Sequence, residues 1–206
     1  GIYGGYFSPT EGAGVGAVLT LLVGLAKKEL KSAGMKAALL STAETTAMVF
    51  MIFLGADMMN ATLALTEMPK MVALWVSGLP VAPLGIVTAV LILYIVLGCV
   101  MDELSMLLLT IPVIFPAVMA LDLWGLTYEL KALWFGILVL MTVSFGLIAP
   151  PVGLNVYVVN SLARDVPMSE TYKGLMPFLA WDIGRLVVLL MVPSLSLWLV
   201  GQLFTR

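Results

Sequence analysis

An acidic pair lies alone in a long apolar stretch of this chain. Asp102 and Glu103 are the only charged residues between positions 83 and 121. A carboxylate at membrane depth costs at least about 2.5 kcal/mol on insertion scales, and such residues often mark ion pathways. Two interpretations stay open at this point. The pair could form a cation site or gate with exposed backbone, or it could lie at a tip that reaches water or lipid headgroups.

A second polar interruption is the segment GLIAPPVGLN, residues 146–155. Pro150 and Pro151 lack backbone donors and disfavour helix at the preceding residue, and Gly153 loosens the chain after them. A helix broken at membrane depth is tolerated only where protein covers the gap or a polar cavity borders it. The freed carbonyls and the Asn155 amide suit sodium, and half-helix N-termini suit an anionic substrate. The alternative is a structural proline kink.

The composition predicts an all-α integral membrane protein. Of 206 residues, 62% are hydrophobic and 11% are charged, against about 25% charged in soluble domains. Mean hydropathy is +1.12. Histidine, the usual metal ligand and general base, is absent. In a membrane protein the net charge of −2 is no argument about a nucleic-acid partner, and none is expected. The single cysteine, Cys99, lies inside an apolar run and is expected to be a small buried hydrophobe.

The first part of the chain predicts three segments. Residues 1–26 read as the end of a broken transmembrane helix, so we expect the chain to begin partway through a larger protein. Residues 27–42 hold four lysines within ten positions and predict a cytoplasmic amphipathic arm, with its helix over 29–42. Residues 43–82 predict a scaffold transmembrane helix followed by a short interfacial helix.

Residues 83–121 predict a re-entrant helical hairpin. Each limb has 15–17 residues, roughly 22–26 Å of helix, which is short for a ~30 Å hydrocarbon core. The acidic pair would lie at the tip, and Pro112 and Pro116 would kink the returning limb. Two complete spans with a cytoplasmic tip give the same outer connectivity and remain an alternative.

Two further membrane segments complete the chain. Residues 122–165 predict a transmembrane helix broken at the tandem prolines, and residues 166–206 a C-terminal transmembrane helix spanning about 177–200. Asp182 and Arg185 are three residues apart and share a helical face. They are expected to neutralise each other at the cytoplasmic boundary.

Three residues are weaker candidates for a substrate cavity: Glu11, Asp57 and Pro151. Glu11 follows Pro9 and fits a first-turn acid capped by a neighbouring hydroxyl, so a capping role is at least as plausible as a ligand contact. Asp57, like Glu44, is expected to be a cavity group or an ordinary charge near the interface.

An ordered set of segments resembles one family, the large membrane subunit (DctM type) of tripartite ATP-independent periplasmic, or TRAP, transporters. The segments are IYGGYFSPTEGAGVGA at 2–17, LGCVMDELSMLLLTIPVIFP at 97–116, WFGILV at 134–139, APPVGLNVYV at 149–158 and GLMPFL at 174–179. The resemblance implies an elevator-type ion-transporter fold with two inverted repeats, each with a re-entrant hairpin and a broken helix. This chain is similar to the C-terminal half.

The resemblance also implies a function, which is sodium-driven uptake of an organic anion with no other cofactor. A periplasmic substrate-binding protein would deliver the anion, such as a dicarboxylate or a 2-oxo acid. A small Q-type membrane subunit would brace the large one in the lipid bilayer of a bacterial or archaeal cytoplasmic membrane.

By the same resemblance, one sodium site lies between the hairpin tip and the following helix break. The residues placed there are Gly98, Asp102, Ser105, Gly146, Ala149, Pro150, Gly153 and Asn155. The chain departs from the family pattern at two positions. Ala149 replaces a common Thr, so backbone carbonyls would carry more of the site, and Ser144 replaces a frequent Glu.

Two other functional classes fit the sequence less well. An intramembrane aspartyl protease would pair Asp57 with Asp102, but LGAD differs from the usual GxGD signature of such sites. A non-transporting scaffold or channel subunit would not need the broken helices.

Overall fold

The described residues are helical throughout their regular structure, which confirms an all-α chain. The computed structural model describes residues 5–28, 30–150, 153–162 and 166–204. Residues 1–51 and 52–206 form two compact units, and each is described by itself. Among the described helices, four are long and apolar enough to cross a membrane: Pro9–Ala26, Ser32–Leu65, Tyr128–Gly146 and Met168–Met191.

The first unit contains α1 (Pro9–Ala26) and the beginning of α2. Ser8 and Glu11 form a capping box at the start of α1, where Pro9 fits because the first helical amide needs no partner. After α1, the Leu30 side chain packs against the backbone of Gly24. No residue of α1 is buried. In a membrane protein its apolar face can meet lipid instead of protein.

Helix α2 (Ser32–Leu65) is one continuous helix of 34 residues. The sequence predicted a separate amphipathic helix over 29–42, but the chain has no proline between positions 32 and 65 and the helix continues. Its length is about 51 Å, well beyond a ~30 Å hydrocarbon core. The placement of either part relative to a membrane stays a prediction.

The predicted hairpin is present as two helices, α4 (Pro83–Gly98) and α5 (Glu103–Met119), joined by a four-residue turn. A hydrogen bond of 2.9 Å joins the Tyr94 and Thr110 hydroxyls across the pair. Because Thr110 donates to the Met106 carbonyl, the Tyr94 hydroxyl is the donor to Thr110. Re-entry from one side of a membrane stays a prediction.

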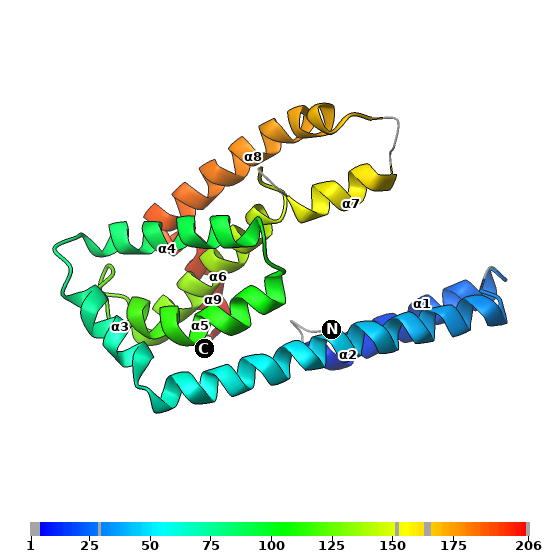
Figure 1. Cartoon of the computed structure of the whole chain (residues 1–206), viewed down its shortest axis with the longest axis horizontal. Coiled ribbons are helices and arrows are strands. Elements are labelled where there is room, and N and C mark those ends of the chain that lie inside the picture. Colours follow the sequence, from blue (N-terminus) through cyan, green and yellow to red (C-terminus); the bar gives the residue numbers. More distant parts are fainter. Residues whose placement is uncertain (1–4, 29, 151–152, 163–165, 205–206) are drawn as a thin grey trace. The chain divides into compact units, whose positions relative to one another are not determined.

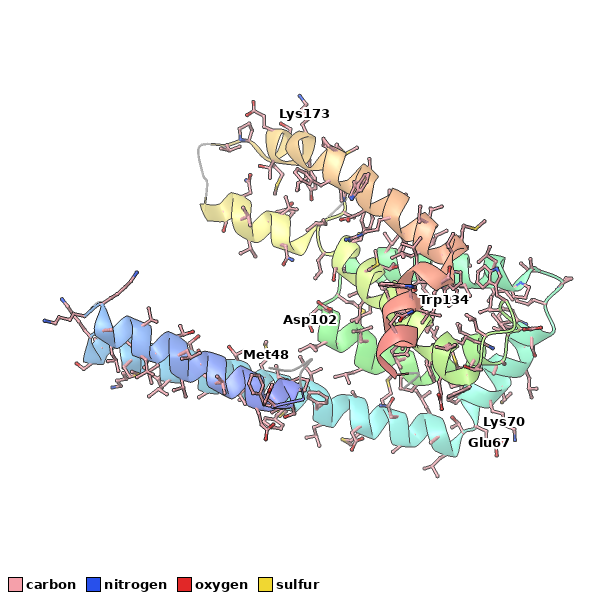
Figure 2. The ribbon with its side chains drawn as sticks, turned by 180° about the vertical axis from the view of Figure 1, so that it is seen from behind. Met48, Glu67, Lys70, Asp102, Trp134 and Lys173 are labelled. Carbon is pink, nitrogen blue, oxygen red and sulfur yellow. The ribbon has the colours of Figure 1, made fainter. Side chains whose placement is uncertain are left out.

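The short predicted interfacial helix appears as α3 (Met68–Ser77), which packs along α5. Val76 is buried in that contact region, whereas Trp75 is largely exposed. An exposed ion pair joins Glu67, the N-cap of α3, to Lys70 in the first turn of that helix (Figure 2).

Helix α6 (Tyr128–Gly146) is the centre of the second unit, since it contacts α4, α5, α8 and α9 (Figure 1). Its fully buried side chains include Trp134, Phe135 and Leu138. These residues join one continuous hydrophobic core with α4 and α5. The core therefore holds the hairpin and the broken helix together.

Helices α4 and α6 approach closely where both end. A Cβ atom on Gly146 would lie 2.9 Å from the Gly98 Cα and 3.1 Å from the Ile95 carbonyl oxygen. A Cβ on Gly98 would lie 3.2 Å from the Gly146 Cα. Backbone is therefore in contact with backbone, which only glycine allows on both sides.

The break predicted inside 122–165 is present, because α6 ends at Gly146 and α7 (Leu154–Leu162) begins after it. The segment expected as one span over 177–200 differs. The structure has α8 (Met168–Met191) and α9 (Pro193–Phe204), separated at Val192 with φ −126° and ψ 76°. Proline at 193 disfavours helix at the residue before it and cannot donate its amide.

The carbonyl left without its usual partner by Pro193 is that of Leu189, four residues earlier. The Trp134 indole, in the core beside α8 and α9 (Figure 2), donates to this carbonyl at 2.9 Å. A buried side chain of α6 therefore satisfies the polar group exposed by the α8–α9 break.

Lys131, about one turn before Trp134 on α6, has a comparable role. It is only 8% exposed, and its Nζ donates to the carbonyls of Met119 (3.2 Å) and Leu121. A cation at the end of α5 satisfies late carbonyls and complements the helix dipole.

We predict that Gly146→Ala destabilises the second unit, because its methyl group would overlap backbone of α4 that cannot move cheaply. The expected loss is about 1–3 kcal/mol in the free energy of unfolding. Gly136→Ala, on the same helix, is the matched control, because a Cβ added at Gly136 would meet no neighbouring atom within 4 Å. Thermal unfolding in detergent measures both, and equal stability of the two variants would refute the close packing.

We predict that Trp134→Phe costs about 1–3 kcal/mol by leaving the Leu189 carbonyl unpaired, in addition to lost packing. Pro193→Ala restores a backbone amide four residues after Leu189. The loss from Trp134→Phe should therefore be smaller in the Pro193→Ala background. Full additivity of the two changes in a double-mutant cycle of unfolding midpoints would contradict this pairing.

Candidate functional site

The site is built where two helices end side by side. Helix α4 ends at Gly98 and α6 ends at Gly146, and these two residues are the contact point of the crossing. The last carbonyls of a helix lack intrahelical partners and carry partial negative charge. Two such ends together attract a cation. The structure thus brings the predicted hairpin tip and the predicted break together.

Cys99 connects the two chain segments directly after the helix ends. Its buried thiol lies 3.7 Å from the Ala149 carbonyl oxygen and 3.9 Å from that of Pro150. The sequence predicted a small buried hydrophobe, and the burial is confirmed. Its contact with the break was missed, although its position next to Gly98 was a signal.

The chain folds back on itself at the break. The backbone amide of Asn155 donates a hydrogen bond to the Leu147 carbonyl at 3.1 Å, and this bond links the two sides of the break. Gly153 has a φ of +56°, a left-handed conformation that favours glycine. Its carbonyl accepts hydrogen bonds from the amides of Val156 and Tyr157 and so begins α7.

The Asn155 side chain is exposed and faces a small cavity of about 150 Å³ between the break, α7 and α8. The cavity is lined by Ile148, Asn155, Val156, Val159, Thr171 and Leu175. The sequence predicted a sodium ligand at Asn155, and this placement near the break leaves that prediction open.

At the hairpin tip, the Asp102 carboxylate is the N-cap of α5 (Figure 2). One of its oxygens accepts hydrogen bonds from the Ser105 amide and the Ser105 hydroxyl, both at 2.9 Å. Asp102 is exposed. Its position at a helix N-terminus is favourable for a carboxylate without any bound ion.

Of the three substrate-cavity candidates, Glu11 and Asp57 fall within the described residues. Glu11 accepts a hydrogen bond from the Ser8 amide at 2.7 Å, which confirms the capping alternative for that residue. Asp57 is exposed on α2, and so is Glu44. Pro151 lies outside the described residues.

Asp182 and Arg185 form the predicted ion pair, with a separation of 2.8 Å. Because α8 begins at Met168, the pair lies well inside the helix and not at its start. It borders an open cavity of about 300 Å³ that also contains Ser144 of α6. The two charges neutralise each other there, which lowers their cost in an apolar environment.

The donor set at the break favours a hard cation. Within the described residues, no group of three or more His, Cys, Asp or Glu side chains could hold a metal ion. The oxygens present are mainly backbone carbonyls, which suit sodium better than a transition metal.

The comparisons with known proteins agree with the sequence resemblance. Residues 1–195 match the family model described as Tripartite ATP-independent periplasmic transporter, DctM component. The C4-dicarboxylate TRAP transporter large permease protein DctM of Pseudomonas aeruginosa is 29% identical over 204 residues, covering 98% of this chain and 46% of that protein. No solved structure matches the chain.

Two further relatives carry other substrates in their names. The sialic acid TRAP transporter large permease protein SiaM of Vibrio cholerae is 27% identical, covering 99% of this chain and 46% of that protein. The isethionate TRAP transporter permease protein DctMQ of Oleidesulfovibrio alaskensis is 25% identical, covering 98% of this chain and 31% of that protein. The chain spans half or less of the length of these relatives. The family match over residues 1–195 shows that this chain belongs to the DctM family of TRAP transporter large permease components.

Proposed function

We propose that this chain is part of the permease of a sodium-driven TRAP-type secondary transporter that imports an organic anion. The observation that carries the proposal is the meeting of two helix C-termini at Gly98 and Gly146. Helix ends buried in this way leave backbone oxygens that a cation can satisfy.

The packing around this point suits a coupling ion. Gly98, Gly146 and Ala149 are all buried, so water competes weakly there for carbonyl oxygens. At reduced dielectric the attraction between a monovalent cation and two helix ends is stronger than in water. A plain proline kink would not require a second helix to end at the same place.

A co-transported cation favours the uptake of an anion, because the membrane potential opposes the inward movement of negative charge. The relatives are named for C4-dicarboxylate, sialic acid and isethionate, all of which are organic anions. Moving one negative charge inward against 100 mV costs about 2.3 kcal/mol. Sodium entering with the substrate offsets that cost, and we infer the same charge balance for this chain.

The tripartite family description supports two protein partners, a periplasmic substrate-binding protein and a small membrane subunit. We propose that the binding protein delivers the anion and that α4 and α5 form a re-entrant hairpin. Their lengths of 16 and 17 residues, about 24 and 26 Å, support re-entry in preference to two full spans. Their shared core supports the further proposal that the hairpin moves with α6 as one elevator unit.

We predict that the complete transporter in proteoliposomes takes up its organic anion only with an inward sodium gradient and with the binding protein present. Replacing sodium by potassium at equal ionic strength should reduce uptake to background. Uptake that ignores both sodium and the binding protein would contradict the proposal and favour a channel or scaffold role.

Substitutions of Asp102 separate its capping role from a role in cation binding. Asp102→Ala removes the cap and should cost about 1 kcal/mol in stability, whereas Asp102→Asn retains the cap and removes the charge. We predict that both variants weaken sodium dependence, measured as the sodium concentration for half-maximal uptake. Unchanged sodium dependence in the stable Asn variant would show that Asp102 is a cap alone.

A further inference from the structure

A side chain from a third helix reaches the break. Tyr172 belongs to the early part of α8, and its hydroxyl oxygen would lie only 2.9 Å from a Cβ placed on Gly153. The sequence did not single out Tyr172, because it lies 19 positions after Gly153 and no motif contains both.

Three oxygens surround the same face of Gly153. Besides the Tyr172 hydroxyl, the carbonyl oxygens of Ile148 and Ala149 would lie 3.2 Å and 3.3 Å from that Cβ position. These atoms come from the last turn before the break and from α8. Gly153 at φ +56° leaves this face bare, so a larger residue would both be strained and collide with the oxygens.

The position of Tyr172 is supported by its neighbours. The adjacent Thr171 hydroxyl donates to the Asn160 side-chain oxygen at 2.9 Å, which ties α8 to α7. The two helices pack side by side (Figure 1). The phenol therefore enters the break from a helix pair that is itself hydrogen-bonded.

Ala149 and Cys99, two residues at the break, provide no side-chain oxygen that could bind a hard cation, whereas a phenol hydroxyl does. Ala149 is buried and offers only its carbonyl, and Cys99 offers a thiol, which is a poor ligand for a hard cation. A neutral hydroxyl adds a strong oxygen ligand without adding charge. It also has a rotatable proton that can point away from a cation.

We propose that the Tyr172 hydroxyl is a side-chain ligand of the cation site at the break, beside the carbonyls of Ile148 and Ala149. This inference rests on the proposed function and adds α8 to the helices that hold the ion. Occupation of the site would then fix α8 against the break, so that sodium binding stabilises the α7–α8 pair as well as the α4–α6 crossing.

The test compares Tyr172→Phe with Tyr157→Phe in the complete transporter. Both changes remove one oxygen and retain the ring, but Tyr157 is 56% exposed on α7. Two readouts are taken across a sodium series balanced with potassium. These are the sodium-induced rise in Tm and the sodium concentration for half-maximal uptake.

We expect Tyr172→Phe to raise the sodium requirement about tenfold in both readouts, as for loss of one bond to a charged partner. Each readout compares sodium with potassium within one variant, so a change of Tm in potassium alone does not count as a sodium effect. Tyr157→Phe should match the parent in both sodium readouts. An unchanged sodium requirement in Tyr172→Phe, or the same shift in both variants, would overturn the inference. Absence of any sodium effect in the parent would instead refute the proposed function.

Discussion

The contact between Gly98 and Gly146 is the constraint on which the site depends. It places the ends of α4 and α6 so close that a methyl group on either residue would meet backbone of the other helix. Two helix ends of the same partial charge repel each other unless something positive lies near them. Their convergence therefore costs free energy in an apolar core, and a cation bound at the proposed site would offset that cost.

The rest of the second unit keeps this arrangement in place by satisfying backbone groups that helix ends and prolines expose. Trp134 donates to the carbonyl freed by Pro193, and Lys131 donates to the late carbonyls of α5. Both side chains belong to α6, the helix whose end forms the site. An unsatisfied backbone group in hydrocarbon costs several kcal/mol, so these bonds stabilise the α8–α9 break and the end of α5.

The sequence was sufficient to locate both interruptions, because tandem prolines, glycines and an isolated acidic pair have strong local effects. It also predicted that Gly98 lies near Gly146, through family resemblance, and the structure agrees. The single helix over 32–65 and the break at Val192 differ from the prediction. The helix over 32–65 continues because that segment contains no proline. The break at Val192 is a local effect of Pro193, which the prediction of one span did not include.

Tertiary contacts explain what the sequence could not give. Cys99 and Tyr172 reach the break because α4, α6 and α8 fold against one another. The position of Cys99 next to Gly98 was a signal for its contact, whereas no motif or spacing along the chain pointed to Tyr172. Asp102 was singled out for its charge, yet its carboxylate is held by Ser105 as a helix cap. An isolated charge in an apolar run does not by itself distinguish a ligand from a cap.

The most direct test of a cation site at the two helix ends uses the thiol already present there. Cys99 is 4% exposed and lies against the carbonyls of Ala149 and Pro150, so ion binding should further restrict access to it. The measurement is the rate of Cys99 alkylation in the complete transporter, followed by mass spectrometry of its peptide, in sodium and in potassium at equal ionic strength. A cation site at the helix ends predicts slower alkylation in sodium, with half-protection at the sodium concentration that half-saturates uptake. Equal rates in the two salts would contradict it.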